Sequence, residues 1–565
     1  MTQFLKFLSS IAQMAKVSRV SRGGLFAVLV LGALAGLTNT ALLGLVNNTI
    51  TAEHAPSTAV IITFAALCVT FPICRFLSQL LLLKVGTRAV YEMRMGLTRK
   101  ILSVPLRHLE ELGKHRIMAA LTGDITTITN TMVDLPMLCM HIATVVGGLC
   151  YLGWLSWKAL LFVLVFMVIG FISYQIPLGK AVREVKLLRD AWDTLFKNFD
   201  SLIDGIKELK LHRRRRTSFV SDVVAKTAEV HQRHTIAGMT VFTFAASTGQ
   251  VLFFIVLGLL IFGFKGWVGM PNRVASGYAL VLLYLMTPLE FIMNRLPDLT
   301  RSNIAMRKVR ELGGELDEHA VDLALVPTAS DDHPVAWSGV EVRGVTHVYK
   351  REGEDGEFVL GPISFGLKPG ELVFLVGGNG SGKTTLAKLL TGLYHPQGGE
   401  ILLDGVPVTE RSSDEYRQLF SVVFTDFHLF DSLLGLERPR LDAEARSYLE
   451  QLKLTHAVRV EDGVLSTLKL SQGQRKRLAL LTAYLEDRPI YLFDEWAADQ
   501  DPTFKEIFYL QLLPALKLRG KTVVVISHDD RYYGCADRIL KLDAGQLVED
   551  VRQPMAEGER QVVGV

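Results

Sequence analysis

Cysteine is scarce in this chain: there are five among 565 residues, and they lack the close spacing of a metal site. Four of them, at positions 68, 74, 139 and 150, lie in apolar stretches. The sequence therefore gives no sign of a zinc site or of a disulfide framework. We interpret the cysteines as reduced packing residues.

An excess of charge is also missing. Lysine and arginine outnumber aspartate and glutamate by only 61 to 57, which gives a net charge of +4. That excess is too small to predict nucleic-acid binding, and the basic residues cluster beside apolar stretches instead. The first residues are basic up to Arg22 and then apolar without an A-x-A cleavage signal, which indicates an uncleaved first span.

Long apolar stretches are what the sequence does contain. A helix needs about 20 apolar residues to cross the hydrocarbon core, where it satisfies its own backbone hydrogen bonds. Six segments are long enough, and we predict membrane-spanning helices at residues 24–46, 58–83, 133–155, 158–178, 236–264 and 275–298.

Basic residues set the predicted orientation. The connection 47–57 contains no lysine or arginine, whereas two longer connections contain many. The positive-inside rule places both long connections and both termini in the cytoplasm. The basic residues concerned are Lys84, Arg88, Arg94, Arg99, Lys100, Arg107, Lys114 and Arg116 in the first connection, and Lys180, Arg183, Lys186, Arg189 and Arg213–Arg216 in the second.

Both long connections keep apolar residues at three- and four-residue steps. Spans two to five are therefore expected to continue into the cytoplasm and to end in short cross-helices near 105–115 and 198–210. These cross-helices either contact a cytoplasmic domain on the same chain or are surface helices without a partner. We interpret Arg213–Arg216 as a solvated cluster that faces lipid headgroups.

The second half of the chain has a different character. Residues 313–337 lose the helical periodicity and are rich in small, acidic and proline residues, so we predict a linker between a membrane domain, 1–312, and a second domain, 338–565. Short apolar strands then alternate with helical stretches, beginning with VEVRGVTHVY, as in an α/β nucleotide-binding domain.

A glycine-rich loop matches the phosphate-binding pattern G-x-x-x-x-G-K-[ST] between the apolar strand ELVFLV and a helix that begins TTLAKLL. Its backbone N–H groups and the helix N-terminus can bind phosphate oxygens. Lys383 supplies a charge to the outer phosphates, and the Thr384 hydroxyl suits Mg²⁺. The predicted loop comprises Gly377, Gly378, Asn379, Gly380, Ser381, Gly382, Lys383 and Thr384, with Thr385 beside it.

The strand IYLFDE ends in two carboxylates. Asp494 is expected to hold Mg²⁺ through water, and Glu495 to polarise the water that attacks the γ-phosphate. An acidic strand end near a turn is common by itself. Its order and spacing after a phosphate loop favour an ATPase.

Between these motifs lies LSQGQ, residues 470–474, which resembles the L-S-G-G-Q signature of the ABC ATPase family. The resemblance implies that Ser471, Gly473 and Gln474 cap the nucleotide bound by the opposite subunit. Gln472 stands where the family has glycine, so its role stays open.

The same resemblance implies roles for three further residues. His528, in VVVISHDD, matches the switch histidine that contacts the γ-phosphate, and Asp501 matches the aspartate that couples the two ATP sites. Tyr349 matches the adenine-stacking aromatic, with core packing as the alternative. The family's metal-contacting glutamine is replaced by Thr425, followed by Asp426; either reaches the metal through water, so this ligand stays open.

One membrane half followed by one ATPase half is the layout of six-span ABC exporters, so the resemblance covers the whole chain. It implies a polytopic α-helical membrane domain fused to an α/β P-loop ATP-binding cassette. It also implies a homodimer in the lipid bilayer of the bacterial inner membrane, with the ATPase domains in the cytoplasm and with ATP and Mg²⁺ as cofactors.

The stretches LSQGQRKRLALL and FDEWAADQDPTFKEIFY are most similar to the cyclic-peptide and siderophore exporters, of the pyoverdine and syringomycin types. This subgroup implies export of a peptide-like compound. A lipid or hydrophobic-drug translocator and a membrane-anchored ATP-dependent sensor are the alternatives.

Polar residues inside the predicted spans are candidates for the substrate cavity, because intramembrane charge tends to face a bundle interior or water. A structural pair or a snorkelling side chain is the ordinary alternative for each. The candidates are Arg75, His141, Gln250 and Glu290.

Overall fold

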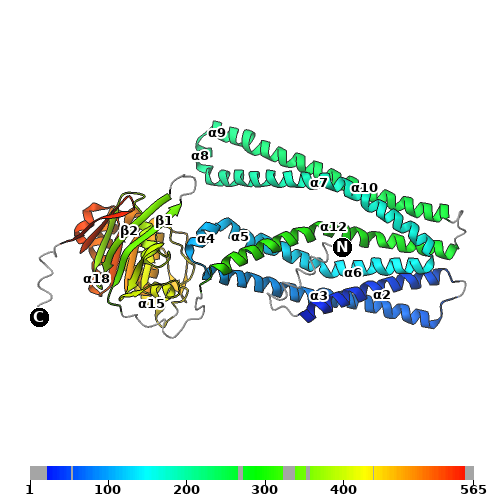
Figure 1. Ribbon diagram of the computed structural model, residues 1–565, viewed down its shortest axis with the longest axis horizontal. Helices are drawn as coiled ribbons and strands as arrows, with labels where there is room; N and C mark the ends of the chain where they lie inside the picture. Colours follow the sequence, from blue (N-terminus) through cyan, green and yellow to red (C-terminus); the bar gives the residue numbers. More distant parts are fainter. Residues whose placement is uncertain are drawn as a thin grey trace. The chain divides into compact units, whose positions relative to one another are not determined.

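The computed structural model describes residues 22–52, 55–264, 271–321, 337–350, 357–436 and 438–553. The chain divides into two compact units (Figure 1). The first, which we call the helical unit, comprises Met1–Met95 and Ala119–Arg310. The second, the sheet unit, comprises Gly96–Met118 and Glu311–Val565, so a short segment of the first half belongs with the second half.

Long helices carry the apolar stretches (Figure 1), and each predicted span except the fifth lies inside one of them. The last part of the fifth span continues as a π-helical segment, η3 (Leu259–Phe264). Within the described residues these helices are α2 (Arg22–Ile50), α3 (Thr58–Ser103), α6 (Ile125–Leu155), α7 (Trp157–Asp204), α10 (Ala225–Gly258) and α12 (Asn272–Glu318).

Length and composition make four described segments able to cross a membrane: Phe26–Ile50, Thr58–Ser103, Lys114–Leu155 and Val274–Arg295. Two further apolar helical segments, Trp157–Gly170 and Ser247–Gly263, are shorter. The structure therefore supports a membrane domain, and the full count of six spans belongs to our proposal below.

Small residues allow close helix packing in the helical unit. A Cβ atom on Gly36 of α2 would lie 2.5 Å from the backbone oxygen of Met140 in α6, so only glycine fits there. Helices α7 and α10 also pack against each other and run side by side (Figure 1).

Short helices follow two of the long ones. The first predicted cross-helix, near 105–115, is confirmed as α4 (Leu106–Leu112), which is followed by α5 (Lys114–Ala119) and the π-helical η1 (Ala120–Asp124). The second begins later than predicted, because α7 continues to Asp204 and breaks only at Gly205. The remaining elements here are α8 (Ile206–Leu211), α9 (Arg213–Ser218) and η2 (Phe219–Val224). Arg213–Arg216 are exposed, as predicted.

The start of the predicted linker is helical, because α12 continues to Glu318. Ion pairs hold this end of the helix within the sheet unit: Lys100 lies 2.5 Å from Asp317, and Arg116 lies 2.8 Å from Glu315. Residues 322–336 of the linker lie outside the described residues.

Two main sheets form the sheet unit. The larger has the strand order β12-β11-β3-β10-β9-β6 and is parallel except for β12. Its strands are β3 (Leu372–Gly377), β6 (Phe420–Val423), β9 (Ile490–Asp494), β10 (Thr522–Ile526), β11 (Arg538–Asp543) and β12 (Gln546–Arg552). The smaller is antiparallel, with the order β2-β1-β4-β5, and contains β1 (Val340–Lys350), β2 (Glu357–Leu367), β4 (Gly398–Leu403) and β5 (Val406–Pro407).

Further elements surround these sheets. Two short strands, β7 (Val460–Glu461) and β8 (Val464–Leu465), pair with each other. The helical elements are α13 (Lys383–Leu390), α14 (Ser413–Arg417), α15 (Leu441–Gln451), α16 (Gln472–Glu486), η4 (Trp496–Asp499), α17 (Pro502–Ile507), η5 (Phe508–Leu512), α18 (Leu513–Leu518) and η6 (Asp530–Cys535).

The central strands are buried on both faces, as expected of a parallel sheet. Along β3, Phe374 faces the core beneath α15 and α16, and its neighbour Leu375 faces the core beneath α13 and the antiparallel sheet. The same alternation occurs at Phe493 and Leu492 in β9. Polar residues of these strands are thus confined to the strand ends.

Candidate nucleotide-binding site

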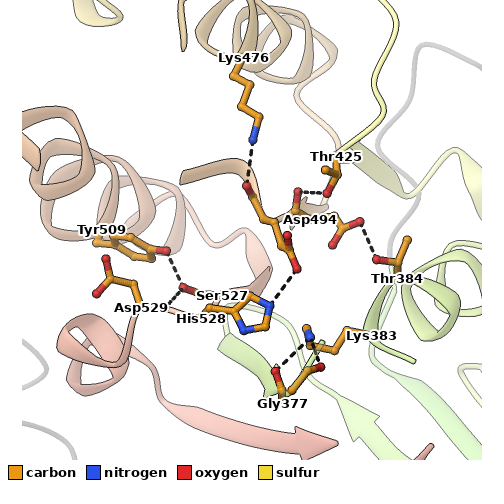
Figure 2. Close-up of polar contacts among 12 residues, drawn as sticks. Gly377, Lys383, Thr384, Thr425, Lys476, Asp494, Tyr509, Ser527, His528 and Asp529 are labelled. Atoms are coloured by element: carbon orange, nitrogen blue, oxygen red, sulfur yellow. Dashed lines mark hydrogen bonds and ion pairs between the residues drawn. The ribbon is translucent and has the colours of Figure 1, made fainter. Parts of the chain in front are cut away.

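The predicted site residues meet at the carboxyl edge of the parallel sheet. Strands β3, β9 and β10 end there at Gly377, Asp494 and Ile526, and Thr425 follows the end of β6. Ligands of parallel α/β sheets bind at this edge. Figure 2 shows the side chains that converge there.

The phosphate loop is a tight turn between β3 and α13. Gly377 has φ +150°, and a Cβ atom there would lie 2.2 Å from the backbone oxygen of Leu542. Gly382, with φ +99°, precedes the first residue of α13. The hydroxyl of Ser381 is buried without a hydrogen-bond partner, which a phosphate oxygen would provide.

Lys383 is folded back over this loop. Its side chain is almost completely buried, and its ammonium donates to the carbonyls of Gly377, at 3.1 Å, and Gly378, at 2.8 Å (Figure 2). Burial lowers the pKa of Lys383, although the nearby charges of Glu495 and Asp494 act in the opposite direction. Within the loop, the Lys383 ammonium is therefore hydrogen-bonded to neutral carbonyls.

Asp494 and Thr384 have the properties of a Mg²⁺ site. The Thr384 hydroxyl donates to one carboxylate oxygen of Asp494 at 3.1 Å, while the other oxygen is buried and unpartnered. Burial raises the pKa of Asp494, and the charge of Glu495 adds to this effect. An orphaned buried carboxylate oxygen beside a hydroxyl suits a hard cation. The described part of the chain contains no group of three His, Cys, Asp or Glu residues that could hold a metal ion by themselves, so phosphate oxygens would complete the ligand set.

Glu495 and His528 form a pair at the centre of the site. The His528 Nε2 atom lies 2.9 Å from the Glu495 carboxylate, and both side chains are partly exposed. Ser527 fixes the preceding turn, because its hydroxyl bonds the Tyr509 hydroxyl at 2.7 Å and accepts from the backbone N–H of Asp529 at 3.1 Å (Figure 2). An attacking water would find a carboxylate acceptor here that is open to solvent on one side.

Thr425 lies beside Asp494. Its hydroxyl donates to the backbone carbonyl of Asp494 at 3.0 Å, and both Thr425 and Asp426 are exposed to solvent. The structure thus shows a direct contact between Thr425 and the predicted metal aspartate. Whether either residue binds the metal through water stays a prediction.

The signature begins a helix. Ser471 is the N-cap of α16, and it exchanges two hydrogen bonds with Gln474: its hydroxyl accepts from the Gln474 N–H, and the Gln474 side chain accepts from the Ser471 N–H. Gln472 is the first helical residue, so a glycine is not required there. This explains how the chain accommodates its departure from the family pattern.

Asp501 and Tyr349 lie on the surface. Asp501 is the N-cap of α17, accepting from the Phe504 N–H at 2.9 Å, and it also pairs with Arg477 at 2.8 Å. Tyr349, at the end of β1, is 46% exposed, so core packing does not account for it. Stacking of Tyr349 on adenine stays a prediction.

Two contacts of the site were not predicted. Lys476 of α16 is 2% exposed and bonds the backbone of Glu495, and Trp496 bonds the backbone of Lys476. The sequence does carry a signal for the burial of Lys476, because helical periodicity places it on the same face of α16 as the buried Leu480 and Ala483.

The four candidates for the substrate cavity do not form one cluster. Arg75 lines a small cavity with Gln79 and Met137, and the ring of His141 lies 4.6 Å from that of Phe291. The last two candidates, Gln250 and Glu290, are exposed in the helical unit. Among the described residues no hydrogen bond or ion pair joins any two of the four.

Comparisons with known proteins agree with this architecture. A model of the ABC transporter transmembrane region matches residues 24–277, and an ABC transporter model matches residues 360–498. The ATP-binding protein SyrD of Pseudomonas syringae pv. syringae is 36% identical over 546 residues, which cover 95% of each chain. The ATP-dependent lipid A-core flippase of Pseudomonas aeruginosa is 26% identical over 499 residues, which cover 84% of this chain and 79% of the flippase.

Solved structures give the same fold. A bacterial Atm1-family ABC exporter with ATP bound matches 95% of each chain with a TM-score of 0.69. The sequences are only 19% identical, so this likeness concerns the fold alone.

Proposed function

Because this chain belongs to the ABC transporter family, we propose that it exports a peptide-like compound, a cyclic peptide or peptide siderophore, by alternating access in a homodimer. It is an ABC exporter, integral to a membrane, whose ATPase is coupled to transport. We further propose that this membrane is the bacterial inner membrane and that the chain crosses it six times. The proposed domains are a membrane domain, 1–312, a linker, 313–337, and an ATPase domain, 338–565.

The pairing of Glu495 with His528 beside a phosphate loop is the observation that carries the proposal. Lys383 would exchange its carbonyl partners for phosphate oxygens, and Thr384 and Asp494 would hold Mg²⁺. Mg²⁺ neutralises charge on the β- and γ-phosphates. Glu495 then accepts a proton from the attacking water, and His528 contacts the γ-phosphate.

Dimerisation follows from the number of motifs. The chain contains one phosphate loop and one signature, and the resemblance implies that each nucleotide lies between the loop of one subunit and the signature of the other. Closure of two chains on two ATP molecules would favour an outward-open state, and hydrolysis would reset it.

A connection from the ATP site to the first cross-helix is visible within the sheet unit. Glu110 of α4 accepts from Lys388 at 3.0 Å and from the Tyr394 hydroxyl. Lys388 belongs to α13, the helix that begins at the phosphate loop. Burial, with help from Glu110, raises the pKa of Tyr394 to about 12, so the phenol stays protonated and donates. We propose that α4 carries the movement of the ATPase to the membrane helices.

Glu110→Gln is therefore expected to reduce the cargo moved per ATP about tenfold, while basal hydrolysis stays within twofold of wild type. The amide cannot pair with the Lys388 ammonium, yet it touches no part of the ATP site. The control is Glu111→Gln: Glu111 is also on α4, and it pairs with Arg107 and His108 of the same helix. Equal transport per ATP in both variants would remove α4 from the proposed path.

Similarity to known exporters supports the proposed cargo. The chain is more similar to SyrD than to the lipid A-core flippase, and its residues 470–481 and 493–509 resemble those of cyclic-peptide exporters. Similarity to the flippase supports a lipid translocator as the second candidate.

Transport by the purified protein in vesicles tests these functions. With the ATPase domains outside, ATP-dependent uptake of a fluorescently labelled cyclic peptide is expected, without movement of a fluorescent phospholipid between leaflets. Movement of the phospholipid alone would favour the lipid translocator. Hydrolysis without movement of either probe would favour the sensor. Alanine at Arg75 and Glu290 in the same assay tests their place in the cavity.

A further inference from the structure

Lys476 is a buried cation that has no role in the proposed function. Its side chain is 2% exposed, and it lies in the second turn of α16, the helix that the signature begins. The ammonium donates to the backbone carbonyl of Glu495 at 3.1 Å (Figure 2). It also lies 2.8 Å from the Asp499 carboxylate. Burying an ammonium is costly unless an opposite charge and hydrogen bonds compensate it. The Asp499 carboxylate and the Glu495 carbonyl provide both here.

The backbone that Lys476 contacts is itself unfavourable. Glu495 has φ +49° and ψ +32°, the left-handed conformation, which a residue with a Cβ atom rarely adopts. Such a conformation persists only where the surroundings fix it. The Glu495 N–H donates to the carbonyl of Ile526 at 3.1 Å, and its own carbonyl accepts from the Ala498 N–H at 3.2 Å and from Lys476. Lys476 thus adds a side-chain hydrogen bond to the backbone contacts that hold Glu495 in this conformation.

Trp496 ties Lys476 into the same network from the other direction. The indole N–H donates to the backbone carbonyl of Lys476 at 2.7 Å. The Trp496 ring is 1% exposed and stacks on Phe508, with 4.4 Å between ring centroids. Two hydrogen bonds therefore hold Lys476 of α16 in place, one to Glu495 and one from Trp496.

We propose that Lys476 is a positioning residue for ATP hydrolysis: through the Glu495 carbonyl it holds the left-handed backbone that aims the Glu495 carboxylate at His528 and the attacking water. The inference rests on the proposed role of Glu495 as the proton acceptor. Asp499 serves as the counter-ion, and its carboxylate is about half exposed. Lys476 touches no nucleotide atom in this scheme, so it affects turnover and not ATP binding.

The test is steady-state hydrolysis by the full-length protein carrying Lys476→Met, which keeps an unbranched side chain one atom shorter and removes its charge. A fall in kcat of at least tenfold is expected, with the KM for ATP within about twofold of wild type. Lys476→Arg keeps a charged donor and is expected to recover most of the lost turnover.

Lys521→Met is the matched control. Lys521 makes the same kind of contact at the other end of α16: it donates to the carbonyl of Asp487 at 2.8 Å and lies 3.1 Å from the carboxylate of that residue. Asp487 is also left-handed, with φ +51°. The control loses an equivalent contact away from the ATP site, so its kcat is expected to stay within twofold of wild type.

Several results would overturn the inference. Wild-type kcat in Lys476→Met would do so, as would a parallel loss of ATP binding or an equal fall in Lys521→Met. If Lys476→Met does not fold, Asp499→Asn removes only a half-exposed counter-ion; it is expected to lower kcat about threefold at unchanged KM, and wild-type kcat would contradict the inference. Hydrolysis that survives Glu495→Gln would instead sink the proposed function, so the two failures are distinguishable.

Discussion

Glu495→Gln is expected to lower the rate of ATP hydrolysis by about 10²- to 10⁴-fold, the usual contribution of a general base. The amide keeps the size of the carboxylate and a hydrogen bond to His528, but it cannot accept a proton from water. The backbone contact with Lys476 is unchanged, because it uses the main-chain carbonyl. Phosphate release under saturating Mg-ATP measures the effect.

Binding of ATP is expected to stay within about threefold of wild type in Glu495→Gln, because the phosphate loop and Asp494 are intact. Bound ATP should also accumulate, since the closed dimer forms but is not reset. Glu506→Gln is the control, an exposed glutamate on α17 outside the site. Steady hydrolysis by Glu495→Gln would show that another group activates the water.

An equal mixture of Lys383→Met and Ser471→Arg subunits is expected to regain roughly a quarter of wild-type hydrolysis, whereas each variant alone is inactive. In a homodimer of either variant both ATP sites are damaged. In a mixed dimer both lesions fall on one site and the other is complete. Half of randomly paired dimers are mixed, and each has one of its two sites intact.

A matched pair of variants checks this reasoning. Lys383 and Asp494 belong to the same half of a site, so mixing Lys383→Met with Asp494→Asn damages both sites of every mixed dimer. No recovery is expected from that mixture. No recovery in the first mixture would mean that the loop and the signature of one chain act together. Equal recovery in both mixtures would mean that Lys383 and Asp494 do not belong to the same half of a site. Either result would contradict the proposed dimer.

Some features of this protein are determined by the sequence alone, because their physics is local. A phosphate loop needs glycines, a lysine and a hydroxyl in consecutive positions between a strand and a helix, and residues 377–384 supply them in order. Buried parallel strands read as short apolar segments, so β3, β9 and β10 could be placed with the residues at their ends. Long apolar stretches likewise located the helices that carry the predicted spans.

Other features depend on contacts between residues far apart in the chain, which local patterns do not specify. Glu110 meets Lys388 across 278 residues, and nothing on either helix alone predicts that pair. The second cross-helix begins only at Ile206, because the fold keeps α7 continuous up to Gly205.

The geometry at Glu495 shows the same division. Its place after a buried strand predicts a role in hydrolysis, but its left-handed backbone and its contact with the buried ammonium of Lys476 exist only in the folded chain. Residue types follow from local chemistry, whereas the direction of a side chain follows from what the whole unit packs around it.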